Sequence, residues 1–342
     1  MISEEIVKKV LVTGATGFIG LHCVHQLLEK GYAVRGTLRS QSRAQEVRDG
    51  LSSTGVDISN LELVEADLLK DDGWEDAVTG MDYILHVASP FIIGMPKHEN
   101  DLIRPAVEGT ERVLSAAIAK KVKKVVLTSS CAAIVDTFDG KQNFTEDDWS
   151  NADHPKIAAY NKSKTLAERR AWEMVEAQTG TKQTKLVVIN PAGVVGPTLT
   201  DDLGTSNVFI KKIICGEVPG AVRMHLGFVD VRDVASAHIA AMTSTKANGQ
   251  RFIISEREFW FSDICQNLRA AGYNKAPTRV MPNWLVRMIG LVDGEIKQIA
   301  SLLGEERYTP ADKARDILKW KPRDATDSII ETAHQLNERG LV

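Results

Sequence analysis

The 342-residue sequence predicts an α/β protein built on a doubly wound parallel sheet, with a smaller, mainly helical lobe towards the C-terminus. Three observations predict this fold. A short apolar run near the N-terminus leads through a glycine-rich turn into a helical pattern. Apolar runs and helical patterns then alternate to about residue 190, and the alternation lapses after Pro197. Because such alternation with short connections is typical of parallel sheets covered by helices on both faces, the expected architecture is of the Rossmann type.

The first element is the stretch from Val10 to Gly20, which predicts a buried strand, a tight turn and a helix that runs to about Lys30. Gly14 allows the backbone to reverse tightly, and Gly20 allows the helix to lie close to the strand. Gly17 lacks a Cβ, so a diphosphate can approach the amides at the start of the helix. An ordinary turn is the alternative, but the flanking strand and helix favour a dinucleotide-binding site.

The second strand is predicted from Tyr32 to Arg39, and its end indicates which dinucleotide binds. Proteins that bind NAD usually place Asp or Glu there to hold the ribose 2′-hydroxyl. This chain has Arg39 instead, with Arg43 a little further on. A guanidinium can hold a 2′-phosphate through two parallel hydrogen bonds, which a carboxylate would repel. Arg39 therefore favours NADPH, and the alternative is a solvated surface arginine.

Three further strands are predicted, over residues 61–67, 81–89 and 123–130. Asp67 and Leu68 follow the first of these, where an adenine ring would lie. His86 ends an apolar run, and we interpret it as a core histidine beneath the cofactor. Ser130 ends the last run. Since ligands in doubly wound sheets bind beyond the carboxyl ends of the strands, Ser130 is a candidate site residue.

Tyr160 and Lys164 are four residues apart at the start of a predicted helix that runs to about Gln178. This spacing places both side chains on one face of the helix. A free tyrosine has a pKa of about 10 and is a poor proton shuttle at neutral pH, whereas an ammonium one turn away favours the phenolate. The pair alone is common on ordinary helices. Together with the glycine turn and Ser130, it predicts a catalytic site.

Bulk composition excludes several classes of function. The net charge of −3 and the charged fraction of 25% give no reason to expect a nucleic-acid or anionic-membrane partner. No apolar run is long enough to cross a bilayer, and the acidic N-terminus does not resemble a signal peptide. The four cysteines are too widely spaced for a metal site or a small disulfide framework, and no metal is expected. A cytoplasmic location is therefore predicted.

After Pro197 the sequence predicts a loop over the active site at Thr198–Asn207 and then a return to the sheet. Two apolar runs, Gly227–Val231 and Phe252–Ile254, flank an alanine-rich helix, and we assign both to the nucleotide-binding sheet. Four large apolar residues are expected in the core of the C-terminal lobe, namely Trp260, Phe261, Trp284 and Met288. The predicted division is therefore a nucleotide-binding domain of residues 1–196 and 227–255, with a substrate-binding lobe of residues 197–226 and 256–342.

The sequence resembles the extended short-chain dehydrogenases/reductases over nearly its whole length. The resemblance depends on five stretches, Thr13–Gly20, Thr128–Ser130, Tyr160 with Lys164, Asn190–Pro197 and Phe228–Ala235. Within that family it is most similar to the dihydroflavonol-reductase-like branch, which includes carbonyl and methylglyoxal reductases. Three stretches indicate this branch, His86–Pro90, Asp147–Trp149 and Ser163–Glu168.

The resemblance implies a role for each candidate residue. Tyr160 donates a proton to the carbonyl oxygen as hydride arrives at carbon, and Ser130 hydrogen-bonds that oxygen. Lys164 holds the nicotinamide ribose and tunes Tyr160, while Pro191 fixes the face of the nicotinamide ring. The remaining expected cofactor contacts follow the strand ends, namely Gly14, Thr16, Gly17, Phe18, Ile19, Gly20, Arg39, Asp67, Leu68, Val87, Ala88, Ser89, Thr128, Gly193 and Val194.

Departures from related sequences narrow the expected activity. Ala106 stands where sugar epimerases and dehydratases carry an asparagine, and Ser129-Ser130 replaces the acidic pair of dehydratases. Val135 replaces the polar residue with which flavonoid reductases hold a phenol ring. The aromatic, cysteine-containing signature of cinnamoyl-CoA reductases is missing as well. The implied activity is an NADPH-dependent reductase of aldehydes or ketones, keto esters included.

Two other functions stay open at this point, a nucleotide-sugar epimerase or dehydratase and a non-catalytic NADP-sensing protein. Sensors of this descent usually lose the tyrosine or the lysine, and both are present here. The expected partner is a small carbonyl compound, and the protein is expected to be a monomer or a homodimer. Candidate pocket residues are Phe91, Ile92, Val135, Met224 and His225.

Overall fold

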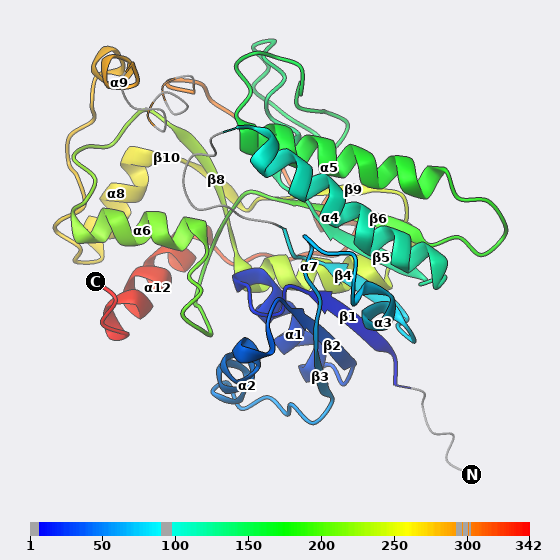
Figure 1. Cartoon of the computed structure of the whole chain (residues 1–342). Helices are drawn as coiled ribbons and strands as arrows, with labels where there is room; N and C mark the ends of the chain where they lie inside the picture. The colour runs from blue at the N-terminus through cyan, green and yellow to red at the C-terminus, as the bar shows by residue number, and fades with distance from the viewer. Residues whose placement is uncertain (1–6, 90–97, 292–295, 297–299, 301) are drawn as a thin grey trace.

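The computed structural model describes residues 7–89, 98–291, 296, 300 and 302–342, and its centre is a seven-stranded parallel sheet (Figure 1). Every pairing between neighbouring strands of this sheet is parallel, which confirms the predicted doubly wound architecture. In sheet order, the strands are β3 (Leu61–Glu65), β2 (Ala33–Leu38), β1 (Lys9–Thr13), β4 (Tyr83–His86), β5 (Lys124–Thr128), β6 (Lys185–Pro191) and β9 (Arg251–Ile254).

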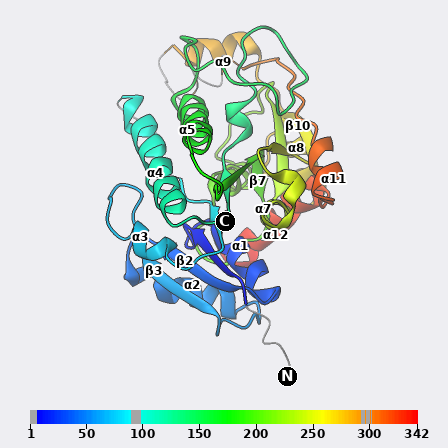
Figure 2. The same cartoon turned by 90° about the vertical axis from the view of Figure 1, so that its right-hand side faces the viewer.

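Helices cover both faces of the sheet. Figure 2 shows α4 and α5 running side by side on one face, while α1 and α7 pack together on the other. The helices of the first face are α3 (Trp74–Val78), α4 (Asn100–Ala119) and α5 (Ala159–Glu176). Those packed with the second face or the sheet edges are α1 (Phe18–Glu29), α2 (Ala44–Ser52), α7 (Val231–Thr243) and α11 (Asp312–Ile317).

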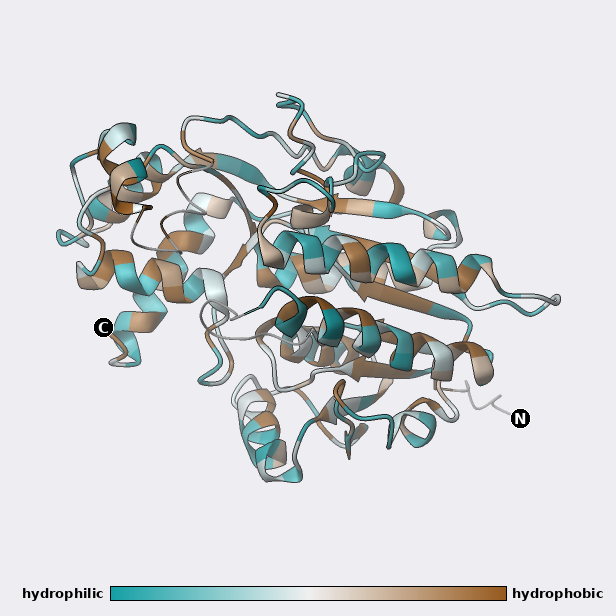
Figure 3. Cartoon of the chain, turned by 45° about the horizontal axis from the view of Figure 1, so that its top comes forward, coloured by the Kyte–Doolittle hydropathy of each residue, from teal (hydrophilic) through white to brown (hydrophobic). Residues whose placement is uncertain are grey.

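The central strands are apolar on both faces because each face is buried. Successive side chains of a strand point to opposite sides of the sheet. In β1, Val10 and Val12 join the core beneath α1 and α7, whereas Leu11 joins the core beneath α3 and α4. This two-sided burial accounts for the continuous apolar runs in the sequence. Figure 3 shows the same pattern as hydrophobic strands between helices that carry a hydrophobic stripe and a hydrophilic stripe.

The strand order reverses between β1 and β4. From β1 the chain proceeds outward to β2 and β3, then crosses back to β4 and continues through β5 and β6 to β9. Thr13 pairs with His86 at the last position of these two strands, so the turns that follow β1 and β4 diverge at this point. Ligands of doubly wound sheets bind at such a switch point.

The second lobe contains a small sheet as well as helices. Its three strands are β7 (Gly193–Val195), β8 (His225–Asp230) and β10 (Arg257–Trp260), in the order β10-β8-β7. A separate apolar core joins this sheet to α6 (Thr205–Cys215), α8 (Phe261–Ala270) and α12 (Ala325–Glu338). A further helix of the lobe, α9 (Asn283–Ile289), lies at its outer end (Figure 1).

One detailed expectation about the large sheet differs from the structure. Phe252–Ile254 lies in β9 and joins the large sheet as predicted, but Gly227–Val231 does not, because β8 pairs with β7 and β10 instead. The alanine-rich helix between them is α7, which does pack on the large sheet. The division of the chain into two domains at residues 197, 227 and 256 stays a prediction.

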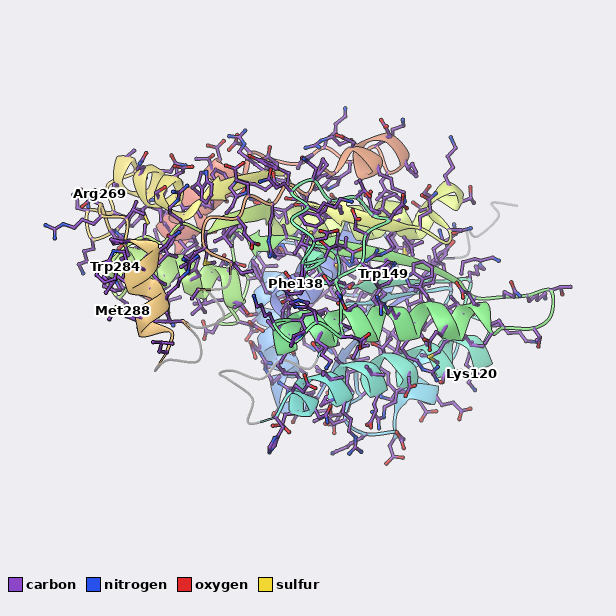
Figure 4. The ribbon with its side chains drawn as sticks, turned by 90° about the horizontal axis from the view of Figure 1, so that it is seen from above. Lys120, Phe138, Trp149, Arg269, Trp284 and Met288 are labelled. Carbon is purple, nitrogen blue, oxygen red and sulfur yellow. The ribbon has the colours of Figure 1, made fainter. Side chains whose placement is uncertain are left out.

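The expected core of the C-terminal lobe also needs correction at α9. Phe261 is buried as predicted, and Trp260 is half-buried. Trp284 and Met288 are instead 63% and 58% exposed, one turn apart on α9, and Figure 4 shows both on this outlying helix. Four-residue spacing on a helix shows only that two residues share a face, not that a partner covers that face.

Two further properties concern the described residues alone. None of their helices combines the length and the apolar character that a membrane span requires. Within the same ranges, no group of three or more His, Cys, Asp or Glu side chains could hold a metal ion.

Candidate functional site

The glycine turn after β1 has the geometry that a nucleotide loop needs. Gly14 has a φ of +70°, and a Cβ there would lie 3.0 Å from the Cβ of Ala88. A Cβ at Gly20 would lie 2.2 Å from the carbonyl oxygen of Gly14, so α1 can approach the turn only with glycine there. Both positions therefore require glycine for reasons that the structure shows directly.

Gly17 is different, because the space in front of it is open. A Cβ there would meet only the Gly14 carbonyl at 3.4 Å and the Asp202 carboxylate at 4.0 Å. Gly17 is also the N-cap of α1 and provides no side-chain cap for the amides of the first turn, which include Phe18 and Ile19. Exposed amides at a helix N-terminus bind phosphate groups well. The turn thus fits the diphosphate of a dinucleotide.

Thr13 fastens the turn after β1 to the turn after β4. Its hydroxyl accepts a hydrogen bond from the amide of Ala88 at 3.0 Å and lies 2.8 Å from Nδ1 of His86. Burial and the nearby Lys164 ammonium lower the pKa of His86 to about 3, so the imidazole is neutral. The hydroxyl proton of Thr13 can then be donated to Nδ1. His86 is therefore a core histidine that holds the strand ends together, as expected.

Tyr160 and Lys164 begin α5 at the carboxyl edge of the sheet. Lys164 Nζ donates to Ser89 Oγ at 3.0 Å and lies 5.8 Å from the centre of the Tyr160 ring. Tyr160 is 40% exposed, so a small molecule can reach its phenol. The structure therefore brings together the predicted pair and a predicted cofactor residue from the end of β4.

Ser130 follows β5, and both its hydroxyl and its carbonyl oxygen accept hydrogen bonds. Its hydroxyl accepts from the amide of Ala132 at 3.1 Å, and its carbonyl accepts from the side-chain amide of Asn190 at 3.2 Å. Asn190 lies in β6 and also donates to the buried carboxylate of Glu168 at 2.8 Å. This arrangement fixes the backbone of Ser130 between neighbouring strands. Its hydroxyl keeps its proton available to a further acceptor.

A small cavity of about 20 Å³ lies beneath Lys164, between α4, α5 and the sheet. It is large enough for about one water molecule. The buried hydroxyl of Ser129 lies on its wall and has no hydrogen-bond partner among the described residues. Five residues predicted to contact the cofactor share this cavity, Leu68, Ala88, Ser89, Thr128 and Lys164.

The two arginines near the end of β2 differ in their surroundings. Arg39 is exposed directly after the strand and has no ion-pair partner within the part of the chain that the structure describes. Arg43 instead donates twice to the carboxylate of Glu46, at 2.9 and 2.8 Å. Arg39 is therefore the cation that is free to bind an added phosphate at this position.

The other predicted cofactor residues lie at or near strand ends, and their contacts differ. Asp67 is half-buried after β3 and accepts from the amide of Leu69 at 3.0 Å. The Thr128 hydroxyl lies 2.7 Å from Nε2 of His238, so this hydroxyl faces α7. Of four more expected contacts, Val87 follows β4, Pro191 ends β6, and Gly193 and Val194 lie in β7.

The candidate pocket residues are placed by several different elements. Val135 is half-buried and packs against the core beneath α1 and α7. Met224 precedes β8 and His225 begins it, and the His225 ring lies 5.0 Å from the rings of both Trp260 and Tyr308. Phe91 and Ile92 lie outside the described residues.

The expected loop over the active site contacts the nucleotide end instead. Residues 198–204 precede α6, which begins at Thr205, within the range expected to be loop. A Cβ at Gly204 would lie 2.7 Å from the ring of Phe18, and a Cβ at Gly50 would lie 2.7 Å from the carbonyl of Leu199. The loop therefore packs against the start of α1 and against the body of α2.

Three supporting residues were not predicted as part of the site. Thr13 and Asn190 were visible only as members of motifs, and Asp136 was not singled out at all. Asp136 is buried and joins Asn161 of α5 to Arg307, each at 2.6 Å. A threonine at the end of the first strand was a usable signal. The contacts of Asp136 span up to 171 residues and leave no local pattern.

Comparison with known proteins identifies the family. The model of the NAD dependent epimerase/dehydratase family matches residues 10–255, which include the whole large sheet except Lys9, the first residue of β1. This chain belongs to that family. The resemblance to extended short-chain dehydrogenases/reductases is thereby confirmed.

Similar proteins of this family are named as reductases. The NADPH-dependent methylglyoxal reductase of Saccharomyces cerevisiae is 34% identical over 276 residues, which cover 75% of this chain and 80% of the relative. Tetraketide alpha-pyrone reductase 2 of Arabidopsis thaliana is 35% identical over 283 residues, which cover 80% and 84%. The crystal structure of the yeast methylglyoxal/isovaleraldehyde reductase with NADPH has a TM-score of 0.79 at 28% identity and covers 98% of this chain and 100% of that chain.

Proposed function

We propose that this protein is an NADPH-dependent carbonyl reductase that converts an aldehyde or ketone to an alcohol. The observation that carries the proposal is the Tyr160–Lys164 pair at the carboxyl edge of the sheet, with Lys164 bonded to Ser89 beside the glycine turn. The reductases among its relatives support the reaction class, and their NADPH supports the choice of cofactor.

The glycine turn and the strand ends would hold NADPH, which supplies the hydride when bound. Gly17 and the first turn of α1 would face the diphosphate, and Arg39 would bind the 2′-phosphate. Lys164 would bind the ribose hydroxyls next to the nicotinamide. Pro191 and the backbone at Gly193 would lie against the ring and select its face.

Tyr160 donates its phenolic proton to the carbonyl oxygen as that oxygen gains negative charge. The Ser130 hydroxyl hydrogen-bonds the same oxygen, and its stabilising effect is greatest when the charge is fully developed. The Lys164 ammonium stabilises the phenolate that Tyr160 leaves behind. The proton and the hydride together complete the alcohol, and solvent returns the proton to Tyr160.

The substrates we propose are aldehydes and ketones, keto esters included. We assign Val135, Met224 and the ring of His225 to the wall of the proposed pocket, which would then be apolar with one polar edge. A methyl, alkyl or aryl substituent would pack against this wall, while the carbonyl faces Tyr160.

The test is NADPH oxidation by the purified protein with a panel of aldehydes, ketones and keto esters. Tyr160→Phe should lower kcat roughly 10²- to 10⁴-fold, since it removes the proton donor and keeps the ring. NADPH affinity, measured by fluorescence titration, should change little. Tyr273→Phe is the matched control, because Tyr273 contacts His334 in the C-terminal lobe. Undiminished turnover in Tyr160→Phe would refute the assignment of the proton donor.

The name of the family favours one competing function, a nucleotide-sugar epimerase or dehydratase. Ala106 argues against it, because it lines the cavity beside Lys164 with a methyl group where those enzymes carry an amide. Tightly retained NAD together with turnover of a nucleotide sugar would favour that function. NADPH binding without turnover of any carbonyl would instead favour the sensor.

A further inference from the structure

Asp136 is a buried carboxylate close to the site that the proposed mechanism does not use. It follows the short helical turn η2 (Cys131–Ala133) and is 3% exposed. Oδ2 accepts from the side-chain amide of Asn161 at 2.6 Å, and Oδ1 accepts from Nη1 of Arg307 at 2.6 Å. Its two oxygens therefore bind two different parts of the molecule.

The first partner belongs to the catalytic helix. Asn161 is the residue after Tyr160 in α5, so its anchoring restrains the first turn of that helix. Figure 4 shows Phe138, two residues after Asp136, beside the start of α5. A bond between a buried carboxylate and this turn limits how far Tyr160 can move with it.

The second partner belongs to the C-terminal lobe. The backbone amide of Arg307 lies 3.1 Å from Nδ1 of His225, the first residue of β8. Arg307 also donates to Glu305 at 2.9 Å, so a second carboxylate orients the same guanidinium. Asp136 is thus connected through one residue to the histidine at the edge of the proposed pocket.

Backbone contacts reinforce this connection. The amide of Tyr308 donates to the carbonyl of Gln142 at 2.7 Å, and the amide of Phe144 donates to the carbonyl of Tyr308 at 2.9 Å. The lobe segment around Arg307 is therefore paired with the segment that follows Asp136. The His225 ring lies between Trp260 and Tyr308, at 5.0 Å from each, which limits its rotation.

We propose that Asp136 is a positioning residue that sets the distance between Tyr160 and the pocket wall at His225. This inference rests on the proposed function, because it assigns Tyr160 as the proton donor. A carbonyl must lie within a few tenths of an ångström of its productive position, and a 1 Å error can cost about 10²-fold in rate. Asp136 is bonded both to the first turn of α5 and to the C-terminal lobe, and it thereby holds these two parts at a fixed separation.

Substrate size should then decide how much Asp136 matters. A carbonyl compound with a long or aryl substituent reaches the wall at His225 and is oriented by it. Methylglyoxal carries only a methyl and a formyl group on its ketone carbon, so we expect that wall to contribute little to its orientation. Loss of Asp136 should therefore impair large substrates far more than small ones.

The experiment compares kcat and KM of Asp136→Ala for an aryl keto ester and for methylglyoxal. For the ester we expect kcat/KM to fall roughly 10- to 100-fold. For methylglyoxal we expect a fall of less than about threefold, and NADPH affinity should stay within about twofold of the wild type. Asp136→Asn can still accept from Arg307, but its NH2 group cannot accept from Nδ2 of Asn161, so it should recover only part of the loss.

Asp233→Ala is the matched control. Asp233 is equally buried and binds Arg323, but it lies in α7. It should lose stability in urea unfolding without any change in the ratio of the two kcat/KM values. If Asp136→Ala fails to fold, Arg307→Met removes the donor, keeps most of the side chain and should change the same ratio.

The inference is overturned if Asp136→Ala and Arg307→Met lower kcat/KM equally for the two substrates. It is also overturned if Asp233→Ala changes the ratio of the two kcat/KM values as these variants do. Failure of the proposed function is a separate result. In that case the wild-type protein reduces neither the ester nor methylglyoxal, whatever residue stands at position 136.

Discussion

The ammonium of Lys164 donates a hydrogen bond to the hydroxyl of Ser89, across 75 residues of sequence and 3.0 Å of space. The contact joins the second turn of α5 to the segment that follows β4, beside the glycine turn. The charge of Lys164 therefore lies near the phenol of Tyr160 and near the position proposed for the ribose of a bound dinucleotide. The following predictions depend on this arrangement and on its neighbours.

Lys164→Met should weaken NADPH binding and lower turnover together, because one ammonium serves both the ribose and Tyr160. We expect kcat/KM to fall roughly 10²-fold or more. Lys162→Met is the control on the same helix, since Lys162 pairs with Glu99. Steady-state kinetics and fluorescence titration of NADPH measure the two effects. A variant that loses turnover but binds NADPH normally would contradict the ribose role.

Arg39→Ala should weaken NADPH roughly 10- to 100-fold and leave NADH almost unchanged, because it removes a charge-assisted bond to the 2′-phosphate. Arg43→Ala should have a smaller effect, since Arg43 is already bonded to Glu46. Dissociation constants for both cofactors, measured at one salt concentration, test this difference. Equal losses for NADPH and NADH in Arg39→Ala would remove the argument for cofactor choice.

Gly14→Ala should cost more stability than Gly31→Ala, although the two residues have similar φ values of +70° and +77°. Both substitutions strain the backbone by about 1–2 kcal/mol. A Cβ at Gly14 would also press on Ala88 at 3.0 Å, whereas nothing lies within 4 Å of one at Gly31. Urea unfolding should show a larger loss of stability in Gly14→Ala than in Gly31→Ala. NADPH affinity should fall only in Gly14→Ala. Equal free energies of unfolding would contradict the close contact.

His238→Gln should make stability less sensitive to acid. Burial lowers the pKa of His238 from 6.5 to about 4, and its Nδ1 lies 2.8 Å from the carbonyl of Val234. Below pH 6.5 the unfolded chain binds a proton here that the folded chain refuses until about pH 4. This contribution to stability is thus complete above pH 6.5 and is lost as the pH falls, by up to about 1.4 kcal/mol per pH unit.

Urea unfolding at pH 7 and pH 5 measures the effect. His22 and His86 have pKa values lowered in the same direction, to about 4 and about 3, and both remain in the variant. The difference between wild type and variant therefore isolates His238. Identical losses of stability on acidification would show that His238 does not control this dependence.

The large sheet was predictable because its strands are buried on both faces and so read as continuous apolar runs. The run that contains β8 was recognised in the sequence, but its place in the large sheet was wrongly predicted. A run of this kind records burial but not the neighbour that buries it, and β8 pairs with β7 and β10 in the smaller sheet. Trp284 and Met288 illustrate the converse case, because these large apolar residues were expected in the core of the lobe and the structure leaves them exposed.

The catalytic candidates were predictable for a related reason. The roles proposed for Gly14, Gly17, Gly20, Tyr160 and Lys164 depend on backbone conformation and on spacing within one turn, which the local sequence determines. Arg39 follows from its place at a strand end. No such local rule exists for Asp136, since its partners come from α5 and from the C-terminal lobe.

The sequence by itself determined the sheet, the nucleotide turn and the chemical groups of the site, because each depends on residues close together along the chain. Tertiary structure alone decided where the loop at 198–204 packs and which residue joins the first turn of α5 to the C-terminal lobe. These features depend on hydrogen bonds and close contacts between residues far apart in sequence. Such contacts are fixed only when the two lobes fold against each other.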